Sequence, residues 1–254
     1  MDTQRIVLAF NGNTASCAAV RWLHATCHAE VAALIVDVGQ ANDLEEVRAR
    51  ALTCGAVRAH VVDRCEVFAR ELVVPAAAAV APIDDEALRR LAYPVIAAAL
   101  VEVAAIERAD AVAYASLDGS LGDEVRALDP ALRILAPVDA WMTGDVGPHV
   151  QHHLLMRPSR ATASDGARVT IGFDEGMPVS VNDVSMGLRE LIEIVSLIGG
   201  QYAVGPWEAS PALGVLRAAY RASGGRGSAT LHLQPGSLTS VDEQAASPAL
   251  VNHA

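Results

Sequence analysis

Three side chains that can bind metal ions lie close together near the amino terminus. His24 and His28 are four residues apart, and Cys27 lies between them. Residues four apart share one face of a helix, and imidazole and thiolate are ligands that zinc prefers. No further ligand follows at metal-binding spacing, so we interpret this group as a solvated or core helix face. Three further histidines lie in a polar stretch without a Cys or acid at ligand spacing, and we interpret them as surface residues: His149, His152 and His153. The sequence therefore predicts no metal site.

The charged residues exclude several kinds of chemistry. The chain has 254 residues, a formal net charge of −11, and 19 basic residues that are all arginine. Without lysine, the protein cannot form a lysine Schiff base or use a Walker-type phosphate lysine. No basic cluster is present to neutralise nucleic-acid phosphates, so we expect no nucleic-acid partner. The sequence also lacks a nucleophile elbow and a GxGxxG motif after a strand, which argues against a serine hydrolase and a dinucleotide site.

Cysteine usage and hydropathy bear on the cellular compartment. The four cysteines, Cys17, Cys27, Cys54 and Cys65, all fall in the first 65 residues, and no pair has CxxC spacing. The opening apolar run is too short for a secretory signal, and no run approaches the roughly 18 apolar residues of a membrane span. We therefore expect reduced thiols, a cytoplasmic location and no membrane association.

Apolar runs alternate with helical patterns through the first part of the chain. Buried strands are predicted at 5–10, 31–36, 60–63, 111–115 and 132–137. Helices are predicted at 14–28, 43–54 and about 86–107. Asn13 or Thr14 is the expected N-cap of the first helix. This alternation is typical of a doubly wound parallel sheet, in which the loops after the strands lie at one edge. We therefore assign residues 1–142 to one nucleotide-binding-like α/β domain.

A change of composition at 143–168, where Gly, Pro, His, Ser and Thr dominate, indicates a linker or loop. Residues 169–254 then predict a small, truncated α+β domain with a flexible tail. It begins with a β-hairpin that turns at Asp174-Glu175-Gly176. Two helices follow, at about 187–198 and 211–222. From about residue 223 the chain is rich in Gly and Ser, which predicts a loosely ordered tail with one possible strand at 229–233.

Several short motifs resemble those of one enzyme family. Asp37-Val38-Gly39-Gln40 follows the second strand, where that family has Asp-Ile-Gly-Gln. Asp123-Glu124-Val125-Arg126 is similar to its Asp-Gln-Val-Arg, and FDEGMPV at 173–179 to its Glu-x-Gly-x-Pro-Val hairpin. Further similar stretches are ALTCGA at 51–56, HVVD at 60–63 and FAR at 68–70. Over about residues 5–222 the chain resembles argininosuccinate synthases. The resemblance implies an ATP pyrophosphatase fold, which is like that of the adenine nucleotide alpha hydrolases, with a shortened second domain.

The resemblance also implies where ligands would bind. After its first strand the family has a Ser-Gly-Gly-x-Asp-Ser/Thr-Ser loop, whose backbone N–H groups and hydroxyls bind phosphate at a helix N-terminus. Residues 11–17 (NGNTASC) take its place here. The nucleotide-binding positions carried over are Ala9, Asn11, Gly12, Asn13, Ser16, Val36 and Gln40. The substrate-binding positions carried over are Arg90, Asp123 and Arg126. The cofactors implied are ATP and Mg²⁺.

The same stretches depart from the family pattern. Ala15 replaces the loop Asp, so a carboxylate that would organise the nucleotide or its Mg²⁺ is missing. Asn11 and Asn13 replace the first Ser and the second Gly, and Asn restricts the backbone more than Gly does. The family's citrulline-contacting Gly-Thr-Ser-x-Ala-Arg-Pro is LRRLAYP at 88–94, and its Thr-Gly-Lys-Gly-Asn-Asp is DGSLGD at 118–123. The hydroxyls, the Lys and the Asn of these motifs are therefore lost.

Two functions remain open on these residues. In the family, ATP adenylates citrulline, and the amine of aspartate then displaces AMP. One reading is an argininosuccinate synthase-like ligase with impaired or altered catalysis, and the other is a non-catalytic paralogue used for binding, regulation or assembly. Asp123 and Arg126 could hold a substrate or form an i,i+3 surface pair, and the loop at Gly12 could be a nucleotide site or an inherited turn. We expect a small-molecule ligand, either a nucleotide or an amino acid, and a homo-oligomer.

Overall fold

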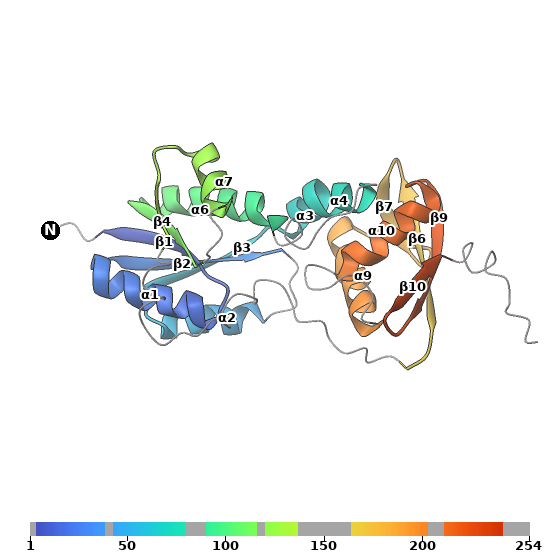
Figure 1. Ribbon diagram of the computed structural model, residues 1–254, viewed down its shortest axis with the longest axis horizontal. Helices are drawn as coiled ribbons and strands as arrows, with labels where there is room; N and C mark the ends of the chain where they lie inside the picture. Colours follow the sequence, from blue (N-terminus) through green and yellow to red (C-terminus); the bar gives the residue numbers. More distant parts are fainter. Residues whose placement is uncertain are drawn as a thin grey trace, which may run out of the picture. The chain divides into compact units, whose positions relative to one another are not determined.

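The computed structural model describes residues 4–38, 43–79, 90–115, 120–136, 164–202 and 211–240. The chain forms two compact units, one of residues 1–65 with 89–154 and the other of residues 66–88 with 155–254 (Figure 1). Among the helices in these described ranges, none has both the length and the apolar character needed to cross a membrane.

The first unit is built around a sheet of five strands in the order β3-β2-β1-β4-β5. Every neighbouring pair in it is parallel. The strands are β1 (Arg5–Ala9), β2 (Glu30–Asp37), β3 (Arg58–Asp63), β4 (Ala111–Tyr114) and β5 (Arg133–Leu135). The central position of β1 and the crossover from β3 to β4 confirm the doubly wound α/β fold predicted from the alternation of strands and helices.

Helices cover both faces of this sheet, because alternate residues of each strand point to opposite sides. One face carries α1 (Thr14–Cys27) and α2 (Leu44–Thr53), and the other carries α6 (Tyr93–Glu107) and α7 (Ser120–Leu128) (Figure 1). Along β1, the fully buried Ile6 and Leu8 pack in the core beneath α1 and α2, whereas Val7 packs beneath α6 and α7. The strand that precedes the candidate loop is therefore held from both sides.

A buried carboxylate lies at the opposite, amino-terminal edge of the sheet. Glu107, the last residue of α6, is only 3% exposed. Its side chain accepts hydrogen bonds from Arg58 Nη1 at 2.6 Å and from His60 Nε2 at 2.7 Å. Arg5 lies 3.6 Å from the same carboxylate and donates to the Glu107 backbone carbonyl at 2.7 Å. These cationic and polar partners at the starts of β1 and β3 therefore offset the burial of a charge.

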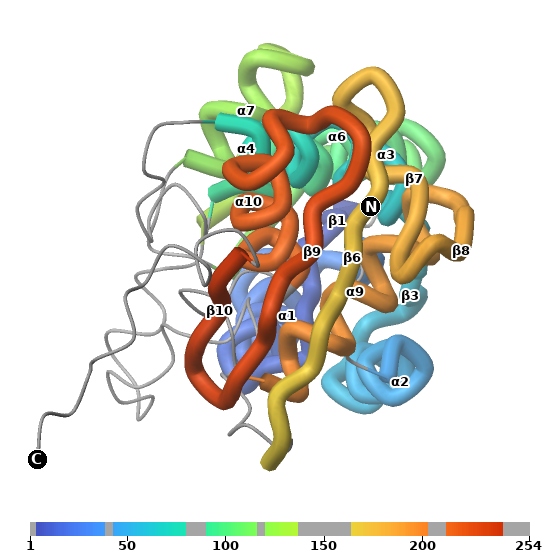
Figure 2. Tube along the Cα trace, turned by 90° about the vertical axis from the view of Figure 1, so that its right-hand side faces the viewer, coloured from blue at the N-terminus to red at the C-terminus, as the bar shows by residue number. Residues whose placement is uncertain are grey.

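The second unit contains an antiparallel sheet of five strands in the order β10-β9-β6-β7-β8. Its strands are β6 (Ala167–Asp174), β7 (Met177–Val181), β8 (Val184–Ser185), β9 (Gly227–Gln234) and β10 (Ser237–Ser240). Figure 2 shows β9 running between β10 and β6. Two helices, α9 (Leu188–Tyr202) and α10 (Pro211–Ser223), pack against this sheet. A helical segment made of α3 (Cys65–Phe68), η1 (Ala69–Val73) and α4 (Val74–Ala78) packs against these helices through η1 and α4. The small α+β domain is confirmed, as is its hairpin of β6 and β7.

The strand predicted at 229–233 is confirmed as part of β9, but the rest of the stretch from about residue 223 to Ser240 is not the loosely ordered tail that was expected. The glycines of this stretch serve as turn residues, since Gly236 connects β9 to β10 with a φ of +74°. β9 also pairs with β6 from Gly227 to Leu233, and Leu231 and Leu233 are fully buried. A Gly/Ser-rich composition therefore marks tight connections here. Most of the linker expected at 143–168 and the residues after Ser240 lie outside the described residues.

Candidate functional site

The candidate loop leaves the sheet at the carboxyl end of β1. The Phe10 N–H still donates to the Leu34 carbonyl at 2.8 Å, so the loop begins directly after the last contact with β2. Gly12 then turns the chain with a φ of +81°, a conformation that favours glycine. A Cβ at this position would lie 3.3 Å from the methyl carbons of Val47, so α2 lies close against the turn. Both constraints favour glycine at position 12.

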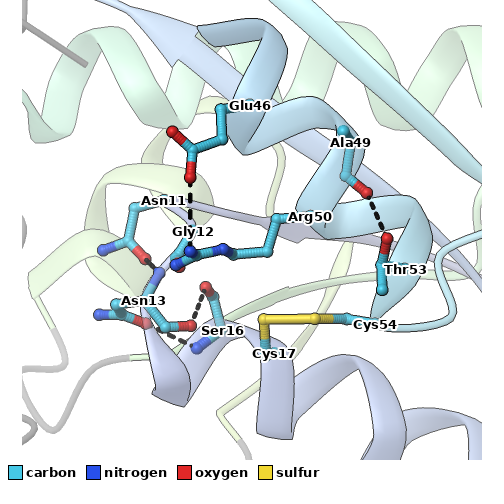
Figure 3. Close-up of a disulfide and its surroundings, with 10 residues drawn as sticks. All are labelled: Asn11, Gly12, Asn13, Ser16, Cys17, Glu46, Ala49, Arg50, Thr53 and Cys54. Carbon is cyan, nitrogen blue, oxygen red and sulfur yellow. Dashed lines mark hydrogen bonds and ion pairs between the residues drawn. A yellow bond between two sulfur atoms is a disulfide. The ribbon is translucent and has the colours of Figure 1, made fainter. Parts of the chain in front are cut away.

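The loop caps its own helix with two asparagine side chains (Figure 3). Asn13 is the N-cap of α1, as expected, and its Oδ1 accepts a hydrogen bond from the Ser16 N–H at 2.7 Å. The Oδ1 of Asn11 accepts from the Asn13 N–H at 3.2 Å. An anion-binding loop at a helix N-terminus holds phosphate oxygens through such backbone N–H groups. Two of these donors are instead satisfied by amide oxygens of the loop itself.

The serine hydroxyl that remains in the loop is also committed. Ser16 is only 1% exposed, and its Oγ donates to the Asn13 carbonyl at 2.9 Å. Ala15, which stands at the position of the family's Asp, is buried as well and has no side-chain oxygen. The loop therefore presents neither a carboxylate for Mg²⁺ nor an exposed serine hydroxyl for a phosphate.

A cation beside the loop was not identified from the sequence. Arg50, on the last turn of α2, donates from Nη1 to the Gly12 carbonyl at 2.8 Å, and its Nη2 lies 3.6 Å from the Glu46 carboxylate (Figure 3). The Arg50 guanidinium is half exposed, and it provides positive charge close to the N-terminus of α1. The sequence contains only one indication that Arg50 lies near the loop. Arg50 follows Val47 by three residues, so both side chains lie on the same face of α2.

The expectation that all four cysteines are reduced is wrong for one pair. Cys17 on α1 and Cys54 at the C-cap of α2 form a disulfide across 37 residues, with their Cα atoms 5.4 Å apart (Figure 3). The pair could not be predicted from a CxxC spacing, because the two cysteines are brought together by the packing of α1 against α2. Cys27 and Cys65 are free thiols.

The structure brings some of the other nucleotide positions to the same edge. Ala9 and Val36 are half-buried residues near the carboxyl ends of the neighbouring parallel strands β1 and β2. They therefore lie on the side of the sheet from which the loop emerges. Gln40 lies outside the described residues.

The three substrate positions carried over from the family lie on α7 and just before α6. Asp123 and Arg126 form an ion pair with each other at 2.8 Å on α7, and their side chains are 79% and 60% exposed. This is the geometry of the i,i+3 surface pair weighed above. Arg90 is exposed just before α6. A role for these three residues in binding substrate remains a prediction.

One group of metal-ligating side chains occurs among the described residues. Asp37, Asp63 and Cys65, at the carboxyl ends of β2 and β3, have ligand atoms within 4.8 Å of one another. Burial raises the pKa of the Cys65 thiol far above its ordinary value, and the two neighbouring carboxylates raise the pKa further. The thiol is therefore protonated at neutral pH, a form that binds metals poorly. His24 on α1 and His28 at its C-cap are exposed and belong to no such group among the described residues.

The Asn13 cap gives a first testable consequence. Asn13→Ala removes the oxygen that accepts from Ser16, and we expect it to lower the free energy of unfolding by about 1 kcal/mol. Asn13→Gly should lower it by only a few tenths of a kcal/mol, because Gly is itself tolerated at the N-cap. Urea unfolding followed by circular dichroism measures both. Equal stability of the Ala variant and the wild type would show that the cap contributes nothing.

Comparison with known proteins identifies the family. The family model described as the arginosuccinate synthase N-terminal HUP domain matches residues 5–146. The argininosuccinate synthase of Syntrophobacter fumaroxidans is 29% identical, over 81% of this chain and 64% of its own length. That of Halalkalibacterium halodurans is 31% identical, over 81% of this chain and 62% of its own. The chain thus spans under two thirds of the length of these relatives. Among solved structures, an NAD⁺ synthetase from Burkholderia pseudomallei is 20% identical over 45% of each chain, with a TM-score of 0.35. On its sequence, this chain belongs to the argininosuccinate synthase family.

Proposed function

We propose that this chain is an argininosuccinate synthase-like protein with impaired catalysis of the family reaction, the ATP-dependent ligation of citrulline and aspartate. The observation that carries the proposal is the self-capped loop. The N–H groups of Asn13 and Ser16 already donate to the side chains of Asn11 and Asn13. A triphosphate would have to displace both amide oxygens before it could use these donors.

The physical cost of that exchange explains why binding should be weak. A phosphate oxygen carries more charge than an amide oxygen and makes a stronger hydrogen bond. However, the amide oxygens are tethered to the loop and lose little freedom when they bind, whereas a free nucleotide loses translational and rotational freedom. The missing loop carboxylate at Ala15 further removes a ligand for Mg²⁺, which would otherwise offset the charge of the phosphates. ATP and Mg²⁺ are thus ligands of the family site that this loop holds poorly.

The alternative is a non-catalytic paralogue used for binding, regulation or assembly. Arg50 favours a remaining weak anion site, because its guanidinium lies beside the N-terminus of α1, where the helix dipole also attracts negative charge. We further propose a homo-oligomer with a nucleotide or amino acid as ligand. We place the protein in the cytoplasm, where the few disulfides that form are usually transient or redox-sensing.

Calorimetric titration with ATP and Mg²⁺, with and without citrulline and aspartate, tests the proposal. We expect a dissociation constant in the millimolar range or weaker for the wild type. The triple variant Asn11→Ser, Asn13→Gly and Ala15→Asp frees two backbone donors and restores a carboxylate. It should bind at least about tenfold more tightly, since a hydrogen bond to a charged group is worth roughly 1.5–3 kcal/mol.

A matched control separates the loop from a general effect of replacing asparagine. The side chain of Asn182 in the second unit also accepts a hydrogen bond from a backbone N–H, that of Thr170, at 2.9 Å. Asn182→Gly should leave ATP binding unchanged. Submillimolar ATP affinity of the wild-type chain would contradict the proposal and favour an active ligase.

A further inference from the structure

One face of α2 is in contact with the candidate loop and with α1 beyond it. Val47, Arg50 and Cys54 follow one another at i, i+3 and i+7, which places them along one side of the helix. Val47 packs against Gly12, and Arg50 donates to the Gly12 carbonyl at 2.8 Å. Cys54 forms the disulfide with Cys17. Of these three contacts, only the disulfide is covalent, and only the disulfide can be broken by reduction.

The disulfide lies directly beside the self-capped turn. The Cys17 N–H donates to the Asn13 carbonyl at 3.1 Å, so Cys17 belongs to the same first turn of α1 as the cap. Cys17 also stands at the last position of the loop, where the resembling pattern has a Ser hydroxyl. In the disulfide, its sulfur is bonded to Cys54 and has no hydrogen to donate to a ligand.

We propose that the Cys17–Cys54 pair is a redox switch of the anion-binding loop. In the oxidised form, the disulfide holds α2 against the turn and keeps the loop in its self-capped conformation. In the reduced form, α2 is no longer tied to α1, and the loop can exchange its amide oxygens for those of a phosphate-bearing ligand. This inference rests on the proposed function, because it concerns the regulation of the same loop.

The redox step is an ordinary thiol–disulfide exchange. A thiolate of a dithiol reductant attacks one sulfur of the pair, which breaks the S–S bond and forms a mixed disulfide. The second thiol of the reductant then displaces the remaining protein sulfur. Two electrons and two protons pass to Cys17 and Cys54, which become thiols, and the reductant becomes a cyclic disulfide. Oxidation by a low-molecular-weight disulfide such as oxidised glutathione reverses both steps.

Two physical effects give the switch its direction. Reduction creates a thiol at Cys17, which adds one weak donor at the end of the loop. Reduction also removes a cross-link that restricts α2, so opening the turn at Gly12 no longer has to move two covalently joined helices. Arg50 stays nearby on α2 and can turn its guanidinium from the Gly12 carbonyl towards an anion. Both effects favour ligand binding by the reduced form.

The experiment compares the affinity for inorganic pyrophosphate in two redox states of the full chain. One sample is treated with oxidised glutathione and the other with dithiothreitol, and mass spectrometry after alkylation in denaturant counts the free thiols, the buried Cys65 included. We expect two alkylated cysteines in the oxidised form, four in the reduced form, and roughly tenfold tighter pyrophosphate binding by the reduced form. Cys54→Ser, which cannot form the disulfide, should bind like the reduced wild type under both conditions.

Cys27→Ser is the matched control, because Cys27 is a free thiol on α1, the helix that carries Cys17, and is not part of the disulfide. It should keep the full redox response. Circular dichroism verifies that each form is folded, and if Cys54→Ser does not fold, the comparison of the two wild-type forms decides. Equal pyrophosphate affinity in both forms, undetectable binding included, would overturn the switch, as would four alkylated cysteines after oxidation. Neither result bears on the proposed function, which fails only if ATP binds tightly or the ligation proceeds.

Discussion

The purified chain, kept reduced with dithiothreitol, is expected to release no pyrophosphate above background when it is given ATP, Mg²⁺, citrulline and aspartate. The reductant ensures that the Cys17–Cys54 disulfide does not limit the reaction. The first reason for the expected result is the loop, where the Asn13 and Ser16 N–H groups are occupied and no carboxylate is present at Ala15. The phosphates of ATP would therefore be poorly oriented for attack.

Two further losses lie in the stretches that resemble the family's substrate motifs. The stretch at 88–94 has arginines where the family pattern has hydroxyls, and Arg90 is exposed just before α6. The stretch at 118–123 lacks the Lys and Asn of the pattern, and Asp123 pairs with Arg126 on the surface. Each lost transition-state contact typically costs about 3 kcal/mol, or roughly a hundredfold in rate. Such losses need not add, but two of them would already lower the rate by about four orders of magnitude.

The assay needs a positive control, for which the argininosuccinate synthase of Halalkalibacterium halodurans is suitable. Pyrophosphate release is followed continuously, and argininosuccinate is identified by mass spectrometry. Release that depends on both amino acids, at a rate near one per second, a common value for enzymes, would contradict the prediction. Other residues of the chain would then have taken over the lost contacts.

The second large effect concerns the buried carboxylate of Glu107. Replacing Arg58 and His60 together by Ala is expected to lower the free energy of unfolding by about 3 kcal/mol, near the lower end for a broken buried ion pair. The two substitutions leave a carboxylate that is 3% exposed without its closest cationic and hydrogen-bonding partners. Glu107→Gln should cost less, because Arg58 and His60 are 57% and 29% exposed and can regain contact with water.

Urea unfolding at pH 7 measures these differences. Arg48→Ala is the control for removing an arginine from an exposed pair, since Arg48 and Glu45 are 47% and 79% exposed. It should change stability by no more than about 0.5 kcal/mol. If the Arg58 and His60 double variant is as stable as the Arg48 variant, the Glu107 carboxylate does not depend on its partners.

The strands of the first unit could be predicted from the sequence because hydrophobic runs in a buried parallel sheet are nearly continuous. Residues 5–10 and 111–115 were predicted, and the strands span Arg5–Ala9 and Ala111–Tyr114. Burial from both faces explains why these runs carry no polar alternation. By contrast, the helical segment from Cys65 to Ala78 was not predicted. In the Gly/Ser-rich stretch after residue 223 only the strand at 229–233 was predicted, and β10 was expected to be part of a flexible tail.

The candidate site was predictable only where a residue acts through its immediate neighbours in sequence. Asn13 could be identified as an N-cap because a cap bonds to N–H groups two or three residues further on. Arg50 and the Cys17–Cys54 pair could not, since both depend on how α2 packs against α1. The hydrogen bond from the Asn13 N–H to the Asn11 side chain likewise depends on the turn at Gly12. Local hydrogen-bonding rules therefore predicted the N-cap but not the contacts of the loop and α1 with α2.

The order of strands in the first sheet has a consequence for how the loop edge is assembled during folding. The contact between Arg5 and Glu30, beside β1 and β2, joins residues 25 positions apart, whereas that between Arg5 and Asp110, beside β1 and β4, spans 105. Closing a longer loop costs more chain entropy, so the β1–β2–β3 half can form before the half with β4 and β5 docks. The seam between β1 and β4, where ligands bind in doubly wound sheets, would then be completed last. During synthesis the loop of Asn11–Ser16 would thus appear early, but the seam between β1 and β4 beside it could form only after β4 has been synthesised.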